Sequence, residues 1–136
     1  MPAGLREAIL CVDDEVVILL AMKQELKRRF GTRFVVETAL DPDEAVEAVR
    51  DLESKGTRTA LVITDWLMPG SRGDRLVQGL RETWPGIKAI LVTGQADEES
   101  IREAMTIGGF DVRLTKPWRA DELYAAIESC VSGEAG

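Results

Sequence analysis

The stretch ALVITDWLMPG, residues 60–70, joins an aliphatic run to an acidic residue and then to a turn. Residues 60–63 are apolar and too few for a helix, so they predict a strand that is buried on both faces. Asp65 follows this run, and Met68-Pro69 with the later Gly73 is typical of a turn that leads into a helix. The pattern therefore places a carboxylate at one end of a buried strand.

Four further apolar runs of the same kind flank this one, and stretches with helical periodicity separate them. The five predicted strands are residues 8–12, 34–36, 60–63, 87–92 and 110–114. In the intervening stretches apolar residues recur three and four positions apart, as in Leu19, Met22, Leu26 and Phe30. This alternation predicts an α/β fold with a parallel sheet and helices on both faces, which binds ligands at the carboxyl ends of its strands.

The composition limits the function before any motif is considered. The 136 residues predict one domain, and 17 basic against 24 acidic residues give a net charge of −7, which disfavours contact with nucleic acid or an anionic membrane. The absence of histidine excludes Ser-His-Asp, Cys-His and histidine-containing zinc sites. Cys11 and Cys130 are expected to be buried thiols. Without a leader or a long apolar run, a cytoplasmic protein is expected.

Polar residues follow four of the five predicted strands. They are Asp13 and Asp14 after the first strand, Asp65 after the third, Thr93 after the fourth and Lys116 after the fifth. Because the carboxyl ends of parallel strands meet at one edge, we expect these side chains to lie together. Three close carboxylates raise one another's pKa unless a cation offsets the repulsion, and Mg²⁺ prefers such oxygen ligands. Asp14 or Glu15, taken alone, is equally compatible with a helix cap.

The expected site lacks a strong general acid or base. Lys116 contributes a positive charge, and the Thr93 hydroxyl can donate a hydrogen bond to a phosphoryl oxygen. A carboxylate can itself accept a phosphoryl group to give an aspartyl phosphate. Asp65, which ends the central strand and precedes a distinct loop, is the best-placed nucleophile.

These motifs resemble those of response regulator receiver domains of two-component signalling. The shared pattern is an acid pair after the first strand, Asp-x-x-Met-Pro with a later Gly after the third, Thr after the fourth and Lys-Pro after the fifth. Every element is present in this order. The resemblance covers residues 8–131, with tails at 1–7 and 132–136, and implies a three-layer (βα)5 flavodoxin-like fold with strand order 2-1-3-4-5.

The resemblance also implies a phosphoacceptor and a metal site. Asp65 would be phosphorylated, and Asp14 and Asp65 would bind Mg²⁺, or Mn²⁺, through their carboxylates. Asp13 would act through a bound water, and the backbone carbonyl of Leu67 would supply another ligand. These four residues form the metal site that the resemblance implies.

Further residues are expected to act on the phosphoryl group once it is bound. The resemblance implies that Thr93 bonds this group, that Lys116 pairs with it, and that the peptide bond before Pro117 is cis. We expect Leu67 and Gln95 to control how readily water reaches the acyl phosphate, since Gln95 can orient a water but is a poor base.

Two positions depart from the family pattern. Arg113 stands three residues before Lys116, where the family often has the Tyr or Phe of an aromatic switch. Arg113 is therefore either a solvated residue or a charge that faces a partner. Trp118 replaces the common Phe after Pro117, and we expect it to pack against the core.

The implied function is a phosphorylation-controlled switch rather than an enzyme that acts on other substrates. A sensor histidine kinase or a histidine phosphotransfer protein would donate the phosphoryl group to Asp65. The surface of the fourth helix, fifth strand and fifth helix would then change, and it could also support a homodimer. The partner or output domain that reads this surface is not identified by the sequence.

Two alternative functions are disfavoured. An aspartyl-phosphate phosphatase would place a second Asp two residues after the nucleophile, where this chain has Leu67. A flavodoxin-like module for a nucleotide or flavin would have a glycine-rich loop after the first strand, where this chain has acids.

Overall fold

A parallel five-stranded sheet forms the centre of the protein in the computed structural model, which describes residues 7–65, 67–68, 71–94, 98–107 and 109–132. Its strands are β1 (Glu7–Val12), β2 (Phe34–Ala39), β3 (Arg58–Asp65), β6 (Lys88–Thr93) and β7 (Val112–Thr115). The order β2-β1-β3-β6-β7 confirms the predicted order 2-1-3-4-5, because β6 and β7 are the fourth and fifth strands of this sheet.

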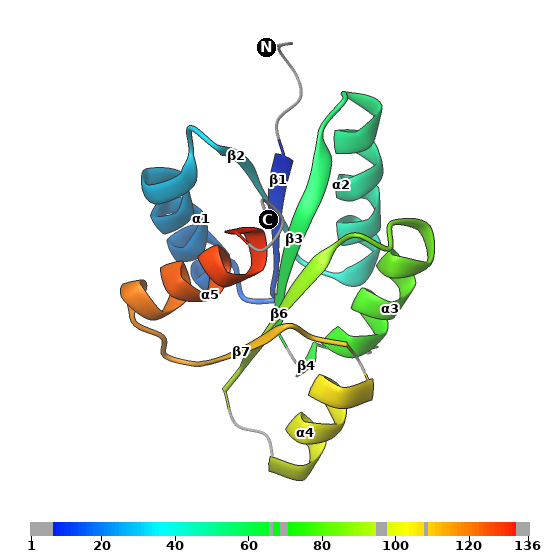
Figure 1. Ribbon diagram of the computed structural model, residues 1–136, viewed down its shortest axis with the longest axis vertical. Helices are drawn as coiled ribbons and strands as arrows, with labels where there is room; N and C mark the ends of the chain where they lie inside the picture. The colour runs from blue at the N-terminus through cyan, green and yellow to red at the C-terminus, as the bar shows by residue number, and fades with distance from the viewer. Residues whose placement is uncertain (1–6, 66, 69–70, 95–97, 108, 133–136) are drawn as a thin grey trace.

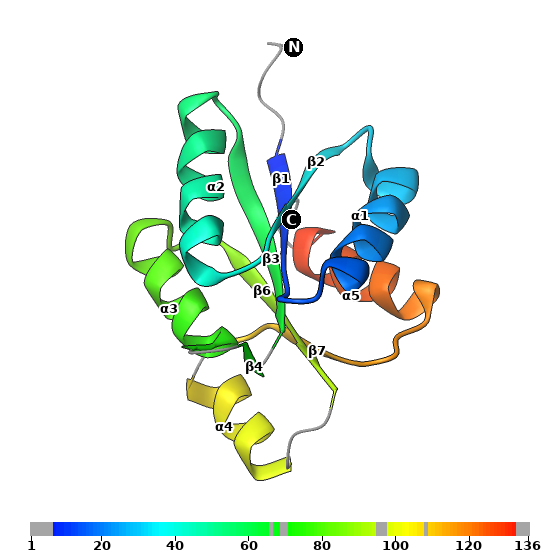
Figure 2. The same ribbon diagram turned by 180° about the vertical axis from the view of Figure 1, so that it is seen from behind.

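Helices cover both faces of the sheet and give three layers (Figures 1 and 2). They are α1 (Val16–Phe30), α2 (Pro42–Ser54), α3 (Gly73–Thr83), α4 (Glu98–Ile107) and α5 (Ala120–Ser132). One apolar cluster joins α1 and α5 to the sheet, and two others join α2, α3 and α4 to the opposite face. Within the described residues, none of these helices combines the length and apolar character needed to span a bilayer.

Local sequence explains where the helices form. The predicted stripe of α1, Leu19, Met22, Leu26 and Phe30, is buried against the sheet. At α2 the Asp41 carboxylate accepts a hydrogen bond from the Glu44 amide at 2.8 Å, and Pro42 takes the first helical position. These contacts satisfy a donor that the first turn would otherwise leave unpaired.

The strand boundaries differ from prediction by one residue in β1 and β6 and by more in the other three strands. β3 runs from Arg58 to Asp65, two residues farther at each end than predicted. β2 extends to Ala39, three residues beyond the predicted end, because it pairs with β1 along its whole length. The last strand starts at Val112 rather than at residue 110. Phe110 is instead buried in the apolar cluster beneath α4, and the Asp111 amide donates to the Ala89 carbonyl at 2.8 Å.

The segment after β3, predicted only as a turn, contains a short antiparallel hairpin of β4 (Leu67–Met68) and β5 (Ser71–Arg72). Residues 66 and 69–70 of the quoted motif lie outside the described residues. Burial of both cysteines is confirmed, and neither forms a disulfide. Burial raises the pKa of Cys11 to about 12 and that of Cys130 to about 11, so both thiols are protonated at neutral pH.

Gly73 brings the start of α3 against the end of β3. A Cβ atom at this position would lie 2.4 Å from the Asp65 carbonyl oxygen and 3.1 Å from Cγ2 of Thr64. Contacts this short require the backbone to move. Gly73 therefore sets the distance between the helix and the strand end that carries Asp65.

We predict that Gly73→Ala lowers the free energy of unfolding by ~1–3 kcal/mol, because the added methyl group overpacks this junction. Gly79→Ala in the same helix is the matched control, since a Cβ there meets nothing within 4 Å. It should stabilise the protein by up to about 1 kcal/mol through helix propensity. Urea denaturation of both variants measures the difference, and equal effects would contradict the close approach at Gly73.

Candidate functional site

Three carboxylates meet at the carboxyl edge of the sheet. Parallel β1 and β3 are neighbours, with Val12 opposite Thr64, so the next residues, Asp13 and Asp65, lie side by side. Ligand oxygens of Asp13, Asp14 and Asp65 all lie within 4.8 Å of one another. Asp13 is buried, with 3% of its surface exposed, Asp65 is partly buried and Asp14 is exposed. The predicted acidic cluster is therefore present.

Lys116 reaches this cluster from the end of β7. Its Nζ atom lies 3.0 Å from Oδ2 of Asp13, 3.3 Å from Oδ2 of Asp65 and 3.7 Å from Oε1 of Glu15. Burial alone would lower the pKa of Lys116, but the hydrogen bonds and negative charges of Asp13 and Asp65 outweigh burial and raise it. The ammonium group is therefore charged, and it compensates two carboxylates at once.

Both carboxylate oxygens of Asp13 accept hydrogen bonds. Oδ1 accepts from the backbone amide of Glu15 at 2.9 Å, and Oδ2 accepts from Lys116. Glu15 occupies the N-cap position of α1, but its side chain makes no capping hydrogen bond. Glu15 follows the acid pair directly, and its position 3.7 Å from Lys116 places it at the same edge of the sheet as the other acids.

The backbone of the neighbouring strands holds Lys116 in place. Its amide donates to the carbonyl of Thr93 at 2.9 Å, which joins the ends of β6 and β7. The Lys116–Pro117 peptide bond is cis, as the resemblance implied. Thr93 is the last residue of β6, and only 2% of its surface is exposed. Since Asp65 pairs with Val92, Thr93 lies one residue beyond the level of Asp65 on the adjacent strand.

A pocket of about 490 Å³ opens beside Lys116. Its lining combines residues from α1, the end of β6 and the segment after β7, namely Ile18, Gly94, Lys116, Pro117 and Trp118. Trp118 is partly buried and packs against the core shared by α1 and α5, as predicted. The contribution of Ile18 was not predicted, because helical periodicity does not show which end of a helix borders the site.

The remaining predicted residues are Leu67, Gln95 and Arg113. Leu67 belongs to β4 and lies two residues after Asp65, the last residue of β3, whereas Gln95 lies outside the described residues. Arg113 is exposed on β7 and does not point into the acidic cluster. Its guanidinium instead forms two hydrogen bonds with the Glu98 carboxylate, at 2.9 and 3.1 Å.

The fold and this cluster define the chain as an α/β domain with an acidic site at the carboxyl edge of a parallel sheet. Residues 9–128 match the family described as "Response regulator receiver domain". The chain therefore belongs to the response regulator receiver domain family, and it is a receiver domain of two-component signalling. This assignment confirms the resemblance seen in the motifs and favours a receiver over the phosphatase and nucleotide-binding alternatives.

Known relatives and solved structures agree with the assignment. Response regulator RppA of Synechocystis sp. is 32% identical over 121 residues, which are 89% of this chain and 49% of that protein. Sensor kinase CckA of Brucella abortus is 31% identical over 114 residues, which are 82% of this chain and 12% of that protein. A response regulator receiver domain protein from Clostridium thermocellum superposes with a TM-score of 0.80 at 27% identity, covering 96% of this chain and 98% of that one.

The chain thus spans about half or less of the curated relatives to which it is similar. These relatives include both response regulators and a sensor kinase. Receiver domains of this kind are regulatory modules, and the same domain serves within proteins of different overall function.

Proposed function

We propose that Asp65 accepts a phosphoryl group from a phosphohistidine on a sensor histidine kinase or a histidine phosphotransfer protein. A carboxylate oxygen of Asp65 would attack phosphorus, forming an O–P bond while the N–P bond breaks and its electron pair returns to the imidazole of the donor. The observation that carries this proposal is the position of Asp65, partly buried and 3.3 Å from the Lys116 ammonium. The chain has no histidine, so the phosphohistidine belongs to the donor.

The donor set fits a divalent cation such as Mg²⁺ or Mn²⁺. Three carboxylates with oxygens within 4.8 Å of one another suit a hard ion that prefers oxygen ligands. Asp14 and Asp65 would bind it directly, together with the backbone carbonyl of Leu67. Asp13 would act through a water. This role agrees with the hydrogen bonds that both of its carboxylate oxygens already accept, from the Glu15 amide and from Lys116. The ion would neutralise charge on the phosphoryl oxygens.

Lys116 and Thr93 would hold the transferred group. The Lys116 ammonium, already beside Asp65, is placed to pair with a phosphoryl oxygen. The Thr93 hydroxyl, at the end of the adjacent strand, would donate a hydrogen bond after a short inward movement. Such a movement of Thr93 and Gly94 links the phosphoryl group to the surface of α4, β7 and α5, where a partner, an output domain or a second copy would bind.

The lifetime of the phosphoryl group would be controlled by access of water. With Leu67 two residues after Asp65, the position that holds a general acid in aspartyl-phosphate phosphatases carries no acidic group. Leu67 and Gln95 are therefore proposed to set a slow self-dephosphorylation, with no turnover of other substrates.

Exposed apolar residues at the start of α1 support docking of a protein donor. Val16, Val17 and Leu20 are 53%, 77% and 56% exposed, respectively, although they lie within two turns of the acid pair. Exposed Lys27 and Arg28 follow on the same side of the helix. We propose that a helix of the donor packs along this surface, with apolar residues near the site and acidic residues farther away.

We predict that Asp65→Asn abolishes labelling by acetyl phosphate with Mg²⁺, because an amide cannot act as the nucleophile. Intact-mass spectrometry would detect the gain of one phosphoryl group on the natural chain, and no gain when EDTA is present during the labelling reaction. The control Asp43→Asn, which removes an exposed acid of α2, should be labelled normally. Normal labelling of Asp65→Asn would refute the proposed phosphoacceptor.

We predict that Lys116→Met binds Mg²⁺ about three- to tenfold more tightly, since it removes a positive charge that opposes a second cation at the same carboxylates. Amide chemical shifts during a Mg²⁺ titration would measure the affinity. Lys55→Met changes the net charge equally, but it removes an ammonium from the end of α2, where it pairs with Asp51. This control should leave the affinity unchanged, and weaker binding by Lys116→Met would contradict the proposed metal site.

We predict that Leu20→Asp slows phosphotransfer from a protein donor by about tenfold or more, because it places a charge within the apolar contact. Labelling by acetyl phosphate should be unchanged, since Leu20 is exposed and is not one of the three acids of the cluster. Transfer rates from a phosphorylated kinase that labels the natural chain would be compared with the small-donor rates. Equal slowing with both donors would indicate damage to the site rather than loss of docking.

A further inference from the structure

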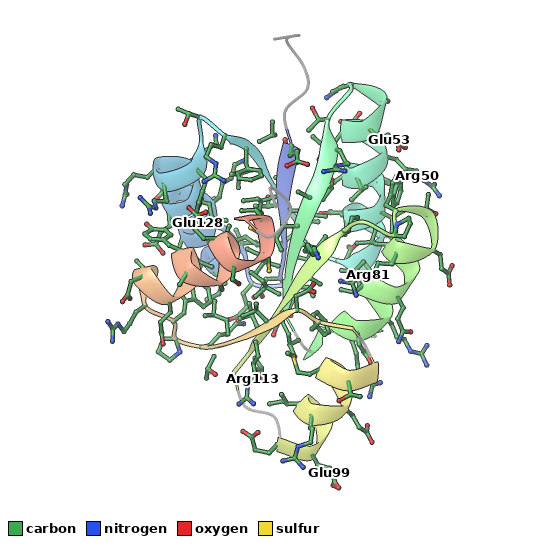
Figure 3. The ribbon with its side chains drawn as sticks, viewed as in Figure 1. Arg50, Glu53, Arg81, Glu99, Arg113 and Glu128 are labelled. Carbon is green, nitrogen blue, oxygen red and sulfur yellow. The ribbon has the colours of Figure 1, made fainter. Side chains whose placement is uncertain are left out.

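The ion pair between Arg113 and Glu98 connects two elements of the surface that receiver phosphorylation is proposed to change. Arg113 belongs to β7, and Glu98 is the first residue of α4. Both guanidinium nitrogens Nη1 and Nη2 donate to the carboxylate, at 3.1 and 2.9 Å, which is the two-point geometry that favours Arg over Lys. In Figure 3 Arg113 points from β7 toward the end of α4 at which Glu99 lies.

Each partner is close in sequence to a residue of the phosphorylation site. Glu98 follows Thr93 by five residues, and Arg113 precedes Lys116 by three. A displacement at the end of β6 would therefore be passed to Glu98. Lys116 holds the end of β7 against the acids of β1 and β3, which fixes the strand that carries Arg113.

The strand order sets the direction of this displacement. β6 lies between β3, which carries Asp65, and β7, which carries Arg113. Movement of Thr93 toward a phosphoryl group on Asp65 is movement toward β3 and therefore away from β7. The start of α4 would then be drawn away from Arg113, and the ion pair would lengthen.

α4 also makes apolar contacts through two of its described side chains. Its buried Ile101 and partly buried Met105 pack in an apolar cluster with Val77 of α3, with β6 and with Phe110. Figure 1 shows α4 at the lower edge of the molecule, near the carboxyl ends of β1 and β3. The apolar contacts thus lie along the middle and the second half of the helix, whereas the Arg113 pair holds its first residue.

We propose that the Arg113–Glu98 ion pair restrains the start of α4 in the unphosphorylated state and is released when the phosphoryl group draws Thr93 inward. The inference rests on the proposed phosphorylation of Asp65. Arg113, at the position where the family often has an aromatic switch residue, would thus act through a charged contact with Glu98. Since the pair opposes the phosphorylated conformation, removing it should favour that conformation.

Beryllofluoride, a phosphoryl mimic, tests the proposal on the full chain in saturating Mg²⁺. Glu98→Gln and Arg113→Gln should each bind beryllofluoride about two- to fivefold more tightly, the range expected for losing an exposed ion pair from one state only. The double variant should bind no more tightly than either single variant. The charge-swapped chain, Glu98→Arg with Arg113→Glu, should return to the natural affinity.

Two controls separate this contact from general charge effects. Arg102→Gln removes a cation that also acts on Glu98, without touching the pair with Arg113. Glu128→Gln removes the exposed Arg33–Glu128 pair, which joins the residue before β2 to α5 at 3.2 Å. Both controls should bind beryllofluoride with the natural affinity.

The outcomes are distinguishable. Natural affinity in both single variants, or tightening that is additive in the double variant, would overturn the restraint. Tightening in Glu98→Gln accompanied by weakening in Arg113→Gln and Arg102→Gln would assign the effect to charge on this surface and would also overturn it. Failure of the natural chain to bind beryllofluoride, or binding that survives Asp65→Asn, would instead remove the proposed function on which the restraint depends.

Discussion

The contact of one ammonium group with two carboxylates is the constraint on which the site depends. Parallel pairing of β1 with β3 places Val12 opposite Thr64. Asp13 and Asp65 are the next residues along these two segments, and therefore they lie side by side. Two carboxylates this close repel each other. The Lys116 ammonium, 3.0 Å from Asp13 and 3.3 Å from Asp65, offsets this repulsion with a positive charge.

The rest of the fold fixes this contact from three sides. Gly73 lets α3 approach the Asp65 carbonyl, so the strand end is held by a helix as well as by its neighbours. The Glu15 amide orients Asp13 at the entry to α1. The hydrogen bond from the Lys116 amide to the Thr93 carbonyl ties the lysine to the strand that would respond to phosphorylation. The acids are therefore preorganised, and a phosphoryl group would change charge within an already defined geometry.

The sequence predicted the sheet and the acidic cluster because both depend on alternation and on the common edge of parallel strands. Features that depend on contacts across the fold were not predictable in this way. Phe110 is an aromatic residue of a type common in strands. It packs instead in the apolar cluster that contains Ile101 of α4, and the strand starts two residues later. Arg113 was expected either to be solvated or to face a partner, and its pairing with Glu98 needed the position of α4. Helical periodicity likewise gave no signal that Ile18 lines the pocket beside Lys116.

The strand order that brings the site residues together also sets the direction in which Thr93 would move after phosphorylation. β6 pairs with both β3 and β7, so it contacts the strand that carries Asp65 on one side and the strand that carries Arg113 on the other. β7 is anchored through Lys116 to the acids of β1 and β3, whereas the start of α4 is held by an exposed ion pair. A new negative charge on Asp65 would act on the anchored Lys116 and on Thr93. Because a force displaces the less restrained element farther, the start of α4 would move more than β7.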